Sequence, residues 1–284
     1  MAAVAFLGTG LLGSGMVEGM LRRGDTVAVW NRTESKARAL EALGAKAAAT
    51  PADAVAGADR VHMTLPDDAV VDELMTAVRP RLERGAVVLD HSTTSPRGAA
   101  GRVAAMAQSG VRFLHAPVFM SPQMARDGIG IMLVSGPQPV FDAVRGALEK
   151  MTGEVWYLGE QGDLAAAHKI FGNSMLFVIA SGVADVFAMA KGLGIAPTDA
   201  LAVFSKFQPG GLIKSRGEKM ARGDFSATFE LTMARKDIRL MIEAAGTQPM
   251  VVLPSIAKAM DQAIAKGHGQ QDLGAIAAEV VAPA

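Results

Sequence analysis

The sequence predicts an α/β protein with a doubly wound, mostly parallel sheet, followed by an all-helical C-terminal domain. Three observations support this fold class. A glycine-rich turn, residues 8–13, follows an apolar run near the start of the chain. Short apolar runs then alternate with segments of helical periodicity up to about residue 160, which is typical of βαβ units. After Gly162 the strand signals stop and only helical spacing continues.

The elements follow from this periodicity, taken in chain order. Strands are expected at 4–7, 27–30, 60–65, 86–90, 111–115, 129–134 and 154–158, and helices at 11–22, 35–43, 67–78 and 96–108. In the second half, one long helix at 163–190 is followed by helical segments at 201–206, 212–220, 229–246, 254–266 and 273–281.

The sequence predicts two domains, residues 1–162 and 163–284, with the long helix 163–190 between them. The longest charge-free apolar run, residues 170–184, lies in this helix. It is shorter than the roughly 20 residues that span a bilayer, so we expect a buried core helix.

Composition excludes several classes of protein. The 284 residues carry 28 basic and 28 acidic side chains, so no net charge drives binding to nucleic acid or an anionic membrane. The absence of cysteine excludes disulfides, thiol catalysis and thiolate metal sites. The histidines lack metal-ligand spacing, and no secretory segment is evident. We expect a cytoplasmic protein with no metal, nucleic-acid or membrane partner.

The turn Gly8-Thr9-Gly10-Leu11-Leu12-Gly13 has the context of a dinucleotide site, because a strand precedes it and a helix follows. Gly8 permits the tight turn, Gly10 lets the backbone approach a pyrophosphate, and Gly13 allows close packing of helix on strand. The N–H groups that open the helix would face the phosphates. The pattern predicts a Rossmann-type domain; the alternative is a plain glycine turn. Gly15 and Gly19 predict close packing of the helix on the sheet.

The second strand ends in Asn31-Arg32-Thr33, without the carboxylate that usually holds the ribose diol of NAD. Arg32 can pair with a 2′-phosphate, and Asn31 and Thr33 can add neutral hydrogen bonds. The segment predicts NADP(H), with NAD(H) at lower efficiency. The alternative is a solvated arginine and use of both cofactors.

Two later strand ends should face the same crevice, because ligands bind at the carboxyl ends of parallel strands. Leu65-Pro66 follows one strand and is expected beside the cofactor. Thr93 follows another, and we expect it near the nicotinamide ribose. Ser95, directly before a proline, is expected to cap the next helix.

Lys169 and Asn173 are four residues apart and share one face of the long helix. The neighbouring residues are largely apolar. Lys169 is either a lysine whose ammonium reaches solvent or a functional amine whose pKa is lowered by partial burial. Spacing alone leaves both interpretations open.

Four blocks of the chain resemble the β-hydroxyacid dehydrogenase family, which includes 3-hydroxyisobutyrate dehydrogenases and glyoxylate/succinic semialdehyde reductases and is similar to 6-phosphogluconate dehydrogenase. The blocks are residues 6–13, 90–96, 162–173 and 229–240. The resemblance implies that Lys169 is the general acid/base, that Asn173 assists substrate binding, and that Lys236 reaches the nicotinamide end of the cofactor. For Lys236, the alternative is a salt bridge with Asp237. It also implies a homodimer or homotetramer.

The family's substrate is a small β-hydroxyacid or the corresponding semialdehyde or 2-oxoacid, and its motif usually reads Asp-Ala-Pro-Val-Ser-Gly-Gly. Here the matching residues include Val118, Phe119, Met120 and Ser121, followed by Pro122. We expect these residues to bind the substrate, in a pocket more apolar than is usual. A less polar ketone or an imine is the alternative substrate, although imine reductases generally lack the lysine. A non-catalytic dinucleotide-binding protein is the third interpretation.

Overall fold

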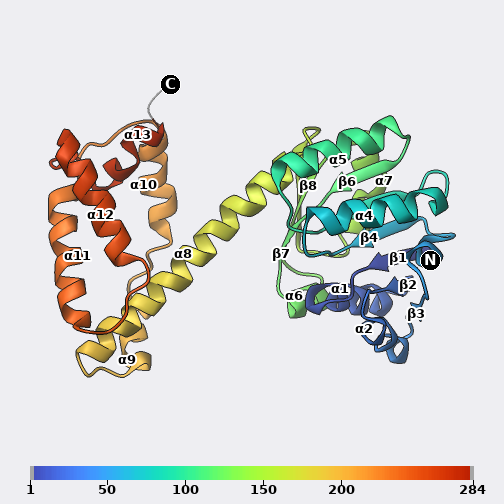
Figure 1. Ribbon diagram of the computed structural model, residues 1–284, viewed down its shortest axis with the longest axis horizontal. Helices are drawn as coiled ribbons and strands as arrows, with labels where there is room; N and C mark the ends of the chain where they lie inside the picture. The colour runs from blue at the N-terminus through green and yellow to red at the C-terminus, as the bar shows by residue number, and fades with distance from the viewer. Residues whose placement is uncertain (1–2, 282–284) are drawn as a thin grey trace. The chain divides into compact units, whose positions relative to one another are not determined.

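The computed structural model describes residues 3–281. These residues form two compact units that meet between Asn173 and Ser174, inside helix α8 (Leu164–Gly192). Figure 1 shows the sheet and its helices in the first unit and a purely helical second unit. The predicted boundary at 162/163 lies at the start of α8 and stays a prediction.

The first unit is built on a mostly parallel sheet, as the sequence predicts. Its strand order is β3-β2-β1-β4-β5-β6-β8-β7, with β9 paired to β8. The pairs β6–β8 and β7–β8 are antiparallel. The order turns back at β1, which lies between β2 and β4, so a crevice is expected at the carboxyl ends of these strands. The strands are Ala3–Leu7, Thr26–Trp30, Lys46–Ala47, Arg60–Met63, Val87–Asp90, Arg112–His115, Val118–Phe119, Ile131–Ser135 and Glu154–Gly159 for β1 to β9.

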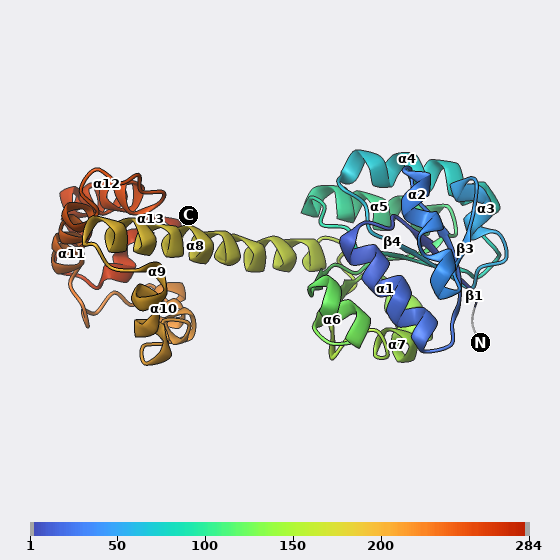
Figure 2. The same cartoon turned by 90° about the horizontal axis from the view of Figure 1, so that it is seen from below.

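Helices cover both faces of the sheet (Figure 2). One face packs against α1 (Leu11–Arg22) and α7 (Gln138–Leu148), and the other against α4 (Asp68–Val78) and α5 (Pro96–Gln108). The bounds of α1 and α5 match the prediction. The prediction omitted α7, although Val140, Phe141, Val144 and Leu148 have helical spacing. It also omitted β3, β7, α3 (Pro51–Val55) and α6 (Pro122–Asp127), which are too short to show a period. The helix predicted at 35–43 is in fact α2 (Glu34–Arg38) followed by a separate 3₁₀ turn (Glu41–Leu43).

Two glycines of α1 pack differently from the prediction. A Cβ on Gly15 would lie 2.5 Å from the carbonyl oxygen of Pro122, and one on Gly19 would lie 2.8 Å from that of Ala125. Both neighbours belong to α6. Helix–helix contact, and not packing on the sheet, therefore requires these glycines.

The second unit is held by helix packing and by two buried carboxylates. Leu231 and Ile238 of α11 (Leu231–Ala245) pack on Met260 of α12 (Leu253–Ala263). Asp185 of α8 accepts hydrogen bonds from the first three backbone N–H groups around the start of α12, those of residues 251–253. Asp272 accepts from Arg216 and Thr228, which holds its pKa well below the usual range even though burial acts in the opposite direction. The remaining helices are α9 (Pro197–Leu201), α10 (Gly211–Ala221) and α13 (Ala278–Val281).

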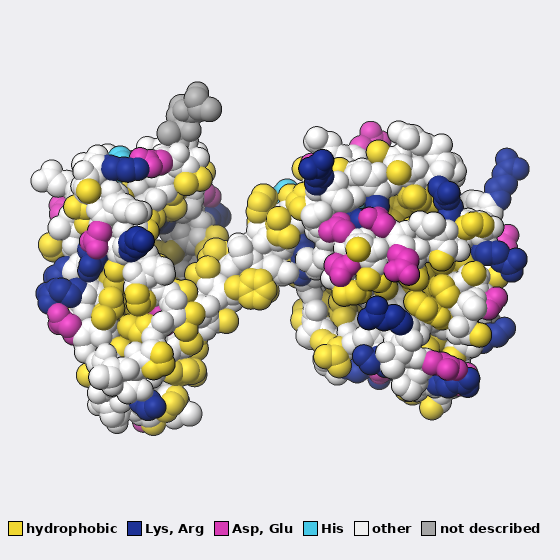
Figure 3. Space-filling model, in the orientation of Figure 1, with side chains coloured by type: hydrophobic (Ala, Val, Ile, Leu, Met, Phe, Trp, Pro, Cys, Tyr) yellow, Lys and Arg dark blue, Asp and Glu magenta, His cyan; other side chains and the backbone are white. Residues whose placement is uncertain are grey.

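The prediction of a buried core helix at 170–184 is wrong for the single chain. Of the most apolar 18-residue window of α8, 6% is buried, and Phe171, Leu176 and Phe177 are exposed by 61%, 57% and 70%. Hydrophobic side chains are visible along this helix in Figure 3. By length and composition alone, α8 is apolar enough to cross a membrane. Hydrophobic periodicity identified the helix. It could not show that no other part of the described chain packs over the apolar side chains of this window.

Candidate functional site

One side of the glycine turn between β1 and α1 packs closely against neighbouring residues. Gly8 has φ +96°, a region that favours glycine, and a Cβ there would lie 2.2 Å from the carbonyl oxygen of Thr64. The N–H of Gly8 donates to the carbonyl of Trp30, and the Thr64 hydroxyl donates to the carbonyl of Gly8. A Cβ on Gly13 would lie 2.1 Å from the carbonyl oxygen of Gly8, so helix and turn pack closely, as predicted.

The opposite side of the turn is open. A Cβ on Gly10 would meet nothing within 4 Å, and Gly10 caps α1 without any side-chain hydrogen bond. Leu11 is 84% exposed. The first N–H groups of the 12-residue helix α1, which have no partner within the helix, therefore face solvent next to Gly10. The space beside Gly10 and these donors suit a bound pyrophosphate.

A cleft of about 420 Å³ adjoins this turn and brings together most of the predicted cofactor residues. Arg32 and Lys36 supply its cations. The structure adds Thr64, which the sequence prediction placed inside a strand, although β4 already ends at Met63. The lining residues are Gly8, Gly10, Trp30, Asn31, Arg32, Thr33, Lys36, Thr64, Leu65, Pro66, Val70, Glu73 and Leu74.

Asn31 has a second role that the sequence did not indicate. Its side-chain oxygen accepts from the N–H of Thr9, 3.0 Å away, and its amide nitrogen donates to the carbonyl of Thr33. The side chain thereby connects the glycine turn with the end of β2.

The loop after β5 is tied to the loop after β4. The Ser92 hydroxyl accepts from the N–H of Leu65 at 2.9 Å, and the N–H of Ser92 donates to the buried carboxylate of Asp90. Thr93, which follows, is exposed on this loop. Ser95 accepts from the N–H of Gly98, so the predicted helix cap is confirmed.

Next to this loop, His62 and His91 form a buried, hydrogen-bonded pair that the sequence did not indicate. His91 Nδ1 lies 2.7 Å from the carbonyl of Ala116, and His91 Nε2 lies 2.9 Å from His62 Nδ1. Because a carbonyl only accepts, His91 carries its proton on Nδ1 and accepts from His62. Burial lowers the pKa of His91 to about 4 and lowers that of His62 well below the ordinary value. Both rings are therefore neutral near pH 7.

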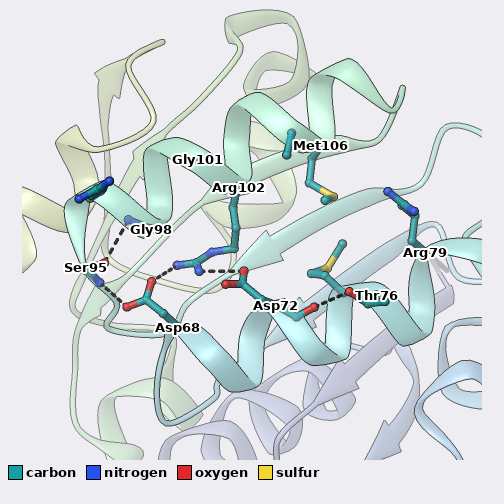
Figure 4. A pocket seen from close by; sticks show the side chains of 12 residues that line it. Asp68, Asp72, Thr76, Arg79, Ser95, Gly98, Gly101, Arg102 and Met106 are labelled. Carbon is teal, nitrogen blue, oxygen red and sulfur yellow. Dashed lines mark hydrogen bonds and ion pairs between the residues drawn. The ribbon is translucent and has the colours of Figure 1, made fainter.

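The first turn of α4 is clamped to α5 by one arginine. Arg102 donates to Asp68 at 2.7 Å and to Asp72 at 3.0 Å, in a groove between the two helices (Figure 4). Asp68 also accepts from the N–H of Ser95. These contacts fix the starts of two helices whose preceding loops carry Pro66 and Thr93.

Lys169 is buried near the start of α8, with 8% of its surface exposed. Its Nζ lies 4.1 Å from the centre of the Phe119 ring. Burial lowers the pKa of this amine, and no carboxylate among residues 3–281 forms an ion pair that would offset the effect. Asn173 lies one turn further along the same helix and is half-buried. The arrangement suits an amine that gains and loses a proton.

The segment after Phe119 differs from the expected substrate cradle. Ser121 caps α6: its hydroxyl accepts from the N–H of Met124, and its own N–H points to the Met124 sulfur at 3.5 Å. Val118 is buried and Met120 half-buried. The polar groups of Ser121 are therefore engaged within α6.

Lys236 lies in the helical unit, on α11. Its Nζ is 2.7 Å from a carboxylate oxygen of Asp237, the ion pair that the alternative interpretation predicted. Both side chains are exposed, so this pair can exchange for another anion.

Comparison with family models accounts for nearly the whole chain. Residues 3–159 match the NAD binding domain of 6-phosphogluconate dehydrogenase, and residues 164–280 match the NAD-binding segment of NADP-dependent 3-hydroxyisobutyrate dehydrogenase. The chain belongs to the β-hydroxyacid dehydrogenase family. Membership in this family agrees with the resemblance seen in the sequence and with the cleft described above. It supports an oxidoreductase scaffold that binds a nicotinamide cofactor.

Among curated relatives in this wider group, cytokine-like nuclear factor N-PAC of Xenopus tropicalis is 29% identical over 84% of the chain and 45% of its own length. The chain spans less than half the length of the N-PAC proteins that it matches. The 2-(hydroxymethyl)glutarate dehydrogenase of Eubacterium barkeri is 26% identical over 96% of the chain and 93% of its own length.

Solved structures confirm the fold of this family member. An imine reductase from Myxococcus stipitatus in complex with NADP⁺ is similar with a TM-score of 0.89 and 22% identity, covering 96% of this chain and 98% of the other. A reductive aminase from Aspergillus terreus in complex with NADPH4, cyclohexanone and allyl amine gives a TM-score of 0.88 at 22% identity, covering 98% and 99%. At this identity the likeness concerns the fold.

Proposed function

We propose that the protein is an NADP(H)-dependent oxidoreductase that interconverts a small β-hydroxyacid and its semialdehyde or 2-oxoacid. The observation that carries this proposal is Lys169, a buried amine with a lowered pKa and no carboxylate partner among the described residues, in the unit that also holds the dinucleotide cleft. The bound nicotinamide would supply or accept a hydride. In reduction Lys169 donates a proton to the carbonyl oxygen, and in oxidation it accepts the hydroxyl proton.

The cofactor is proposed to lie on the open side of the glycine turn, with its 2′-phosphate toward Arg32. Gly10 gives the pyrophosphate room, and the N-terminus of α1 gives it hydrogen-bond donors. Arg32 and Lys36 give the adjoining cleft positive charge. Thr93 and Lys236 are proposed to contact the nicotinamide end.

Lys169→Ala tests the proposal. The variant should lose about 10²- to 10⁴-fold in kcat, because a positioned acid/base typically contributes that much. Its Kd for NADPH, measured by fluorescence titration, should stay within about twofold. Lys191→Ala, an exposed lysine on the same helix, is the matched control and should keep wild-type kcat.

The substrates for this assay are glyoxylate, succinic semialdehyde, methylmalonate semialdehyde and a cyclic imine. Near wild-type turnover by Lys169→Ala would reject the proposed role of this residue. Tight NADPH binding with no turnover of any compound would favour the non-catalytic alternative. A less polar ketone is the second candidate substrate, favoured by the Phe119 ring beside Lys169.

A further inference from the structure

The ring of Phe119 packs closely against α8, where it contacts both the amine of Lys169 and the backbone at Gly172. Lys169 Nζ lies 4.1 Å from the ring centre. One turn along, a Cβ on Gly172 would lie 2.3 Å from Cζ and 2.7 Å from Cε1 of the same ring. Residues three apart share a helix face, so Lys169 and Gly172 together hold the ring against α8.

The backbone behind the ring is equally constrained. Phe119 pairs with Ile131 in the antiparallel ladder of β7 and β8. A Cβ on Gly130 would lie 2.8 Å from the carbonyl oxygen of Phe119 and 2.9 Å from Cβ of Met120. The backbone of Phe119 therefore cannot move away from α8 without a shift of the strand pair.

The residues beside the ring offer little to an anion. Pro122 has no N–H, and the hydroxyl and N–H of Ser121 are both engaged with Met124. Arg126, on the same short helix, pairs with Glu18 at 2.8 Å. The side chains that this segment supplies near Lys169 are the aromatic ring of Phe119 and, next to it in sequence, the thioether of Met120.

We infer that Phe119 determines the substrate class: it favours carbonyl compounds whose substituent is an uncharged aryl or branched alkyl group and disfavours those that carry a carboxylate there. This inference rests on the redox part of the proposed function, in which Lys169 acts on the carbonyl oxygen, and it replaces the β-hydroxyacid substrate with the less polar carbonyl compound named there as the second candidate. A carboxylate placed against the Phe119 ring, Ser121 and Pro122 finds no free hydrogen-bond donor there and is disfavoured, whereas an apolar substituent gains contact area against the ring.

The test compares two substrates of equal chain length, succinic semialdehyde and butanal, with phenylacetaldehyde as the aryl probe and saturating NADPH. The wild-type kcat/KM should favour butanal over succinic semialdehyde by about tenfold or more, and phenylacetaldehyde further still. Phe119→Ser should shift this ratio by about tenfold toward succinic semialdehyde, mainly through KM. Phe119→Leu, which keeps the apolar bulk, should leave the ratio within about threefold of wild type.

Binding gives a second readout that does not depend on turnover. Calorimetry on the enzyme–NADP⁺ complex should show phenylethanol binding to wild type and Phe119→Leu, and weakened about tenfold or more in Phe119→Ser. An unchanged NADPH Kd in each variant shows that the nucleotide-binding unit is folded.

The outcomes separate this inference from the function on which it rests. If wild type reduces both aldehydes in a Lys169-dependent way without discrimination, or prefers succinic semialdehyde, the role of Phe119 is rejected and the proposed function stands. A parallel change of both kcat/KM values in Phe119→Ser also rejects it. If wild type reduces no carbonyl compound, the proposed function fails and the inference fails with it.

Discussion

At the scale of single residues, we propose that Arg32 determines the choice of cofactor. It follows β2 in the position where a carboxylate would hold an NAD ribose, and its guanidinium lines the cleft with Lys36. Arginine pairs with phosphate through planar, bidentate hydrogen bonds, and a phosphate on the 2′-oxygen is what distinguishes the two dinucleotides. Glu73, the carboxylate that also lines the cleft, comes from α4 and not from β2.

Arg32→Ala should lower kcat/KM for NADPH by about 10- to 100-fold, because a charge-assisted hydrogen bond contributes about 1.5–3 kcal/mol. The value for NADH should change by less than about threefold. Steady-state kinetics with each cofactor measures both effects. Arg38→Ala, an exposed arginine paired with Glu34 on the following helix, is the control. A wild-type preference for NADH would overturn the assignment.

At the scale of elements, the two sides of the turn between β1 and α1 have different roles. The inner side packs Gly8 and Gly13 against Thr64, and the outer side leaves Gly10 free. The same turn therefore contributes to folding on one side and offers space and donors to an anion on the other.

This division predicts opposite phenotypes for two alanine substitutions. Gly13→Ala should destabilise the nucleotide-binding unit by about 1–3 kcal/mol, because its Cβ has no space. Gly10→Ala should leave the melting temperature almost unchanged, yet weaken NADPH binding about tenfold or more, since its Cβ occupies the phosphate space. Thermal melts and fluorescence titration separate the two. Equal loss of stability in both variants would contradict the assignment of sides.

The ends of β4 and β5 bury two neutral histidines next to Asp90 and His115, whose carboxylate oxygen and ring Nδ1 lie 3.4 Å apart. Burial opposes the charge on Asp90, yet His115 and Ser92 hold its pKa below the usual value. The hydrogen bond from His62 to His91 fixes the loop that begins at Ser92. This hydrogen bond requires a neutral His91, because a protonated His91 has no lone pair to accept from His62.

The stability of this unit should therefore fall with acidification. The pKa of His91 is about 4 in the folded protein and about 6.5 when unfolded, so between these pH values the unfolded chain binds more protons. Stability is full above pH 6.5 and decreases by about 3 kcal/mol for this group as pH falls toward 4.

Urea titrations from pH 7 to 4.5 measure this effect through tryptophan fluorescence, since Trp30 and Trp156 both belong to the first unit. His91→Asn, which keeps a donor toward Ala116, should flatten the dependence by about one proton. An unchanged slope in this variant would show that His91 does not titrate on unfolding.

At the scale of the whole molecule, α8 is part of both units. Ala165 and Ala166 at its start and Ala188 and Ala190 near its end are buried, while its middle is exposed and apolar. A helix with both ends built into folded units differs from a free membrane anchor. We propose that a second copy of the chain covers the middle, in a homodimer or homotetramer, because water is a poor environment for so large an apolar surface.

Sedimentation velocity should accordingly show a dimer or tetramer for the wild type. Phe177→Glu, which places a charge on the exposed apolar face, should weaken assembly by about 100-fold or more. Leu43→Glu, which also places a charge at an exposed apolar position but on the 3₁₀ turn after α2 in the first unit, should leave assembly unchanged. A monomeric wild type would overturn this proposal.

The sequence alone determined the fold class, the glycine turn, the Ser95 helix cap and the placement of Lys169 and Asn173 on one face of a long helix, because these follow from the local pattern of residues close in sequence. Local periodicity could not determine what lies against what. The tertiary structure decided that Gly15 and Gly19 face α6, that two histidines 29 residues apart form a buried hydrogen bond next to the loop after β5, and that Phe119 covers Lys169. It also decided that α8 is exposed, since burial depends on which surfaces the chain brings together.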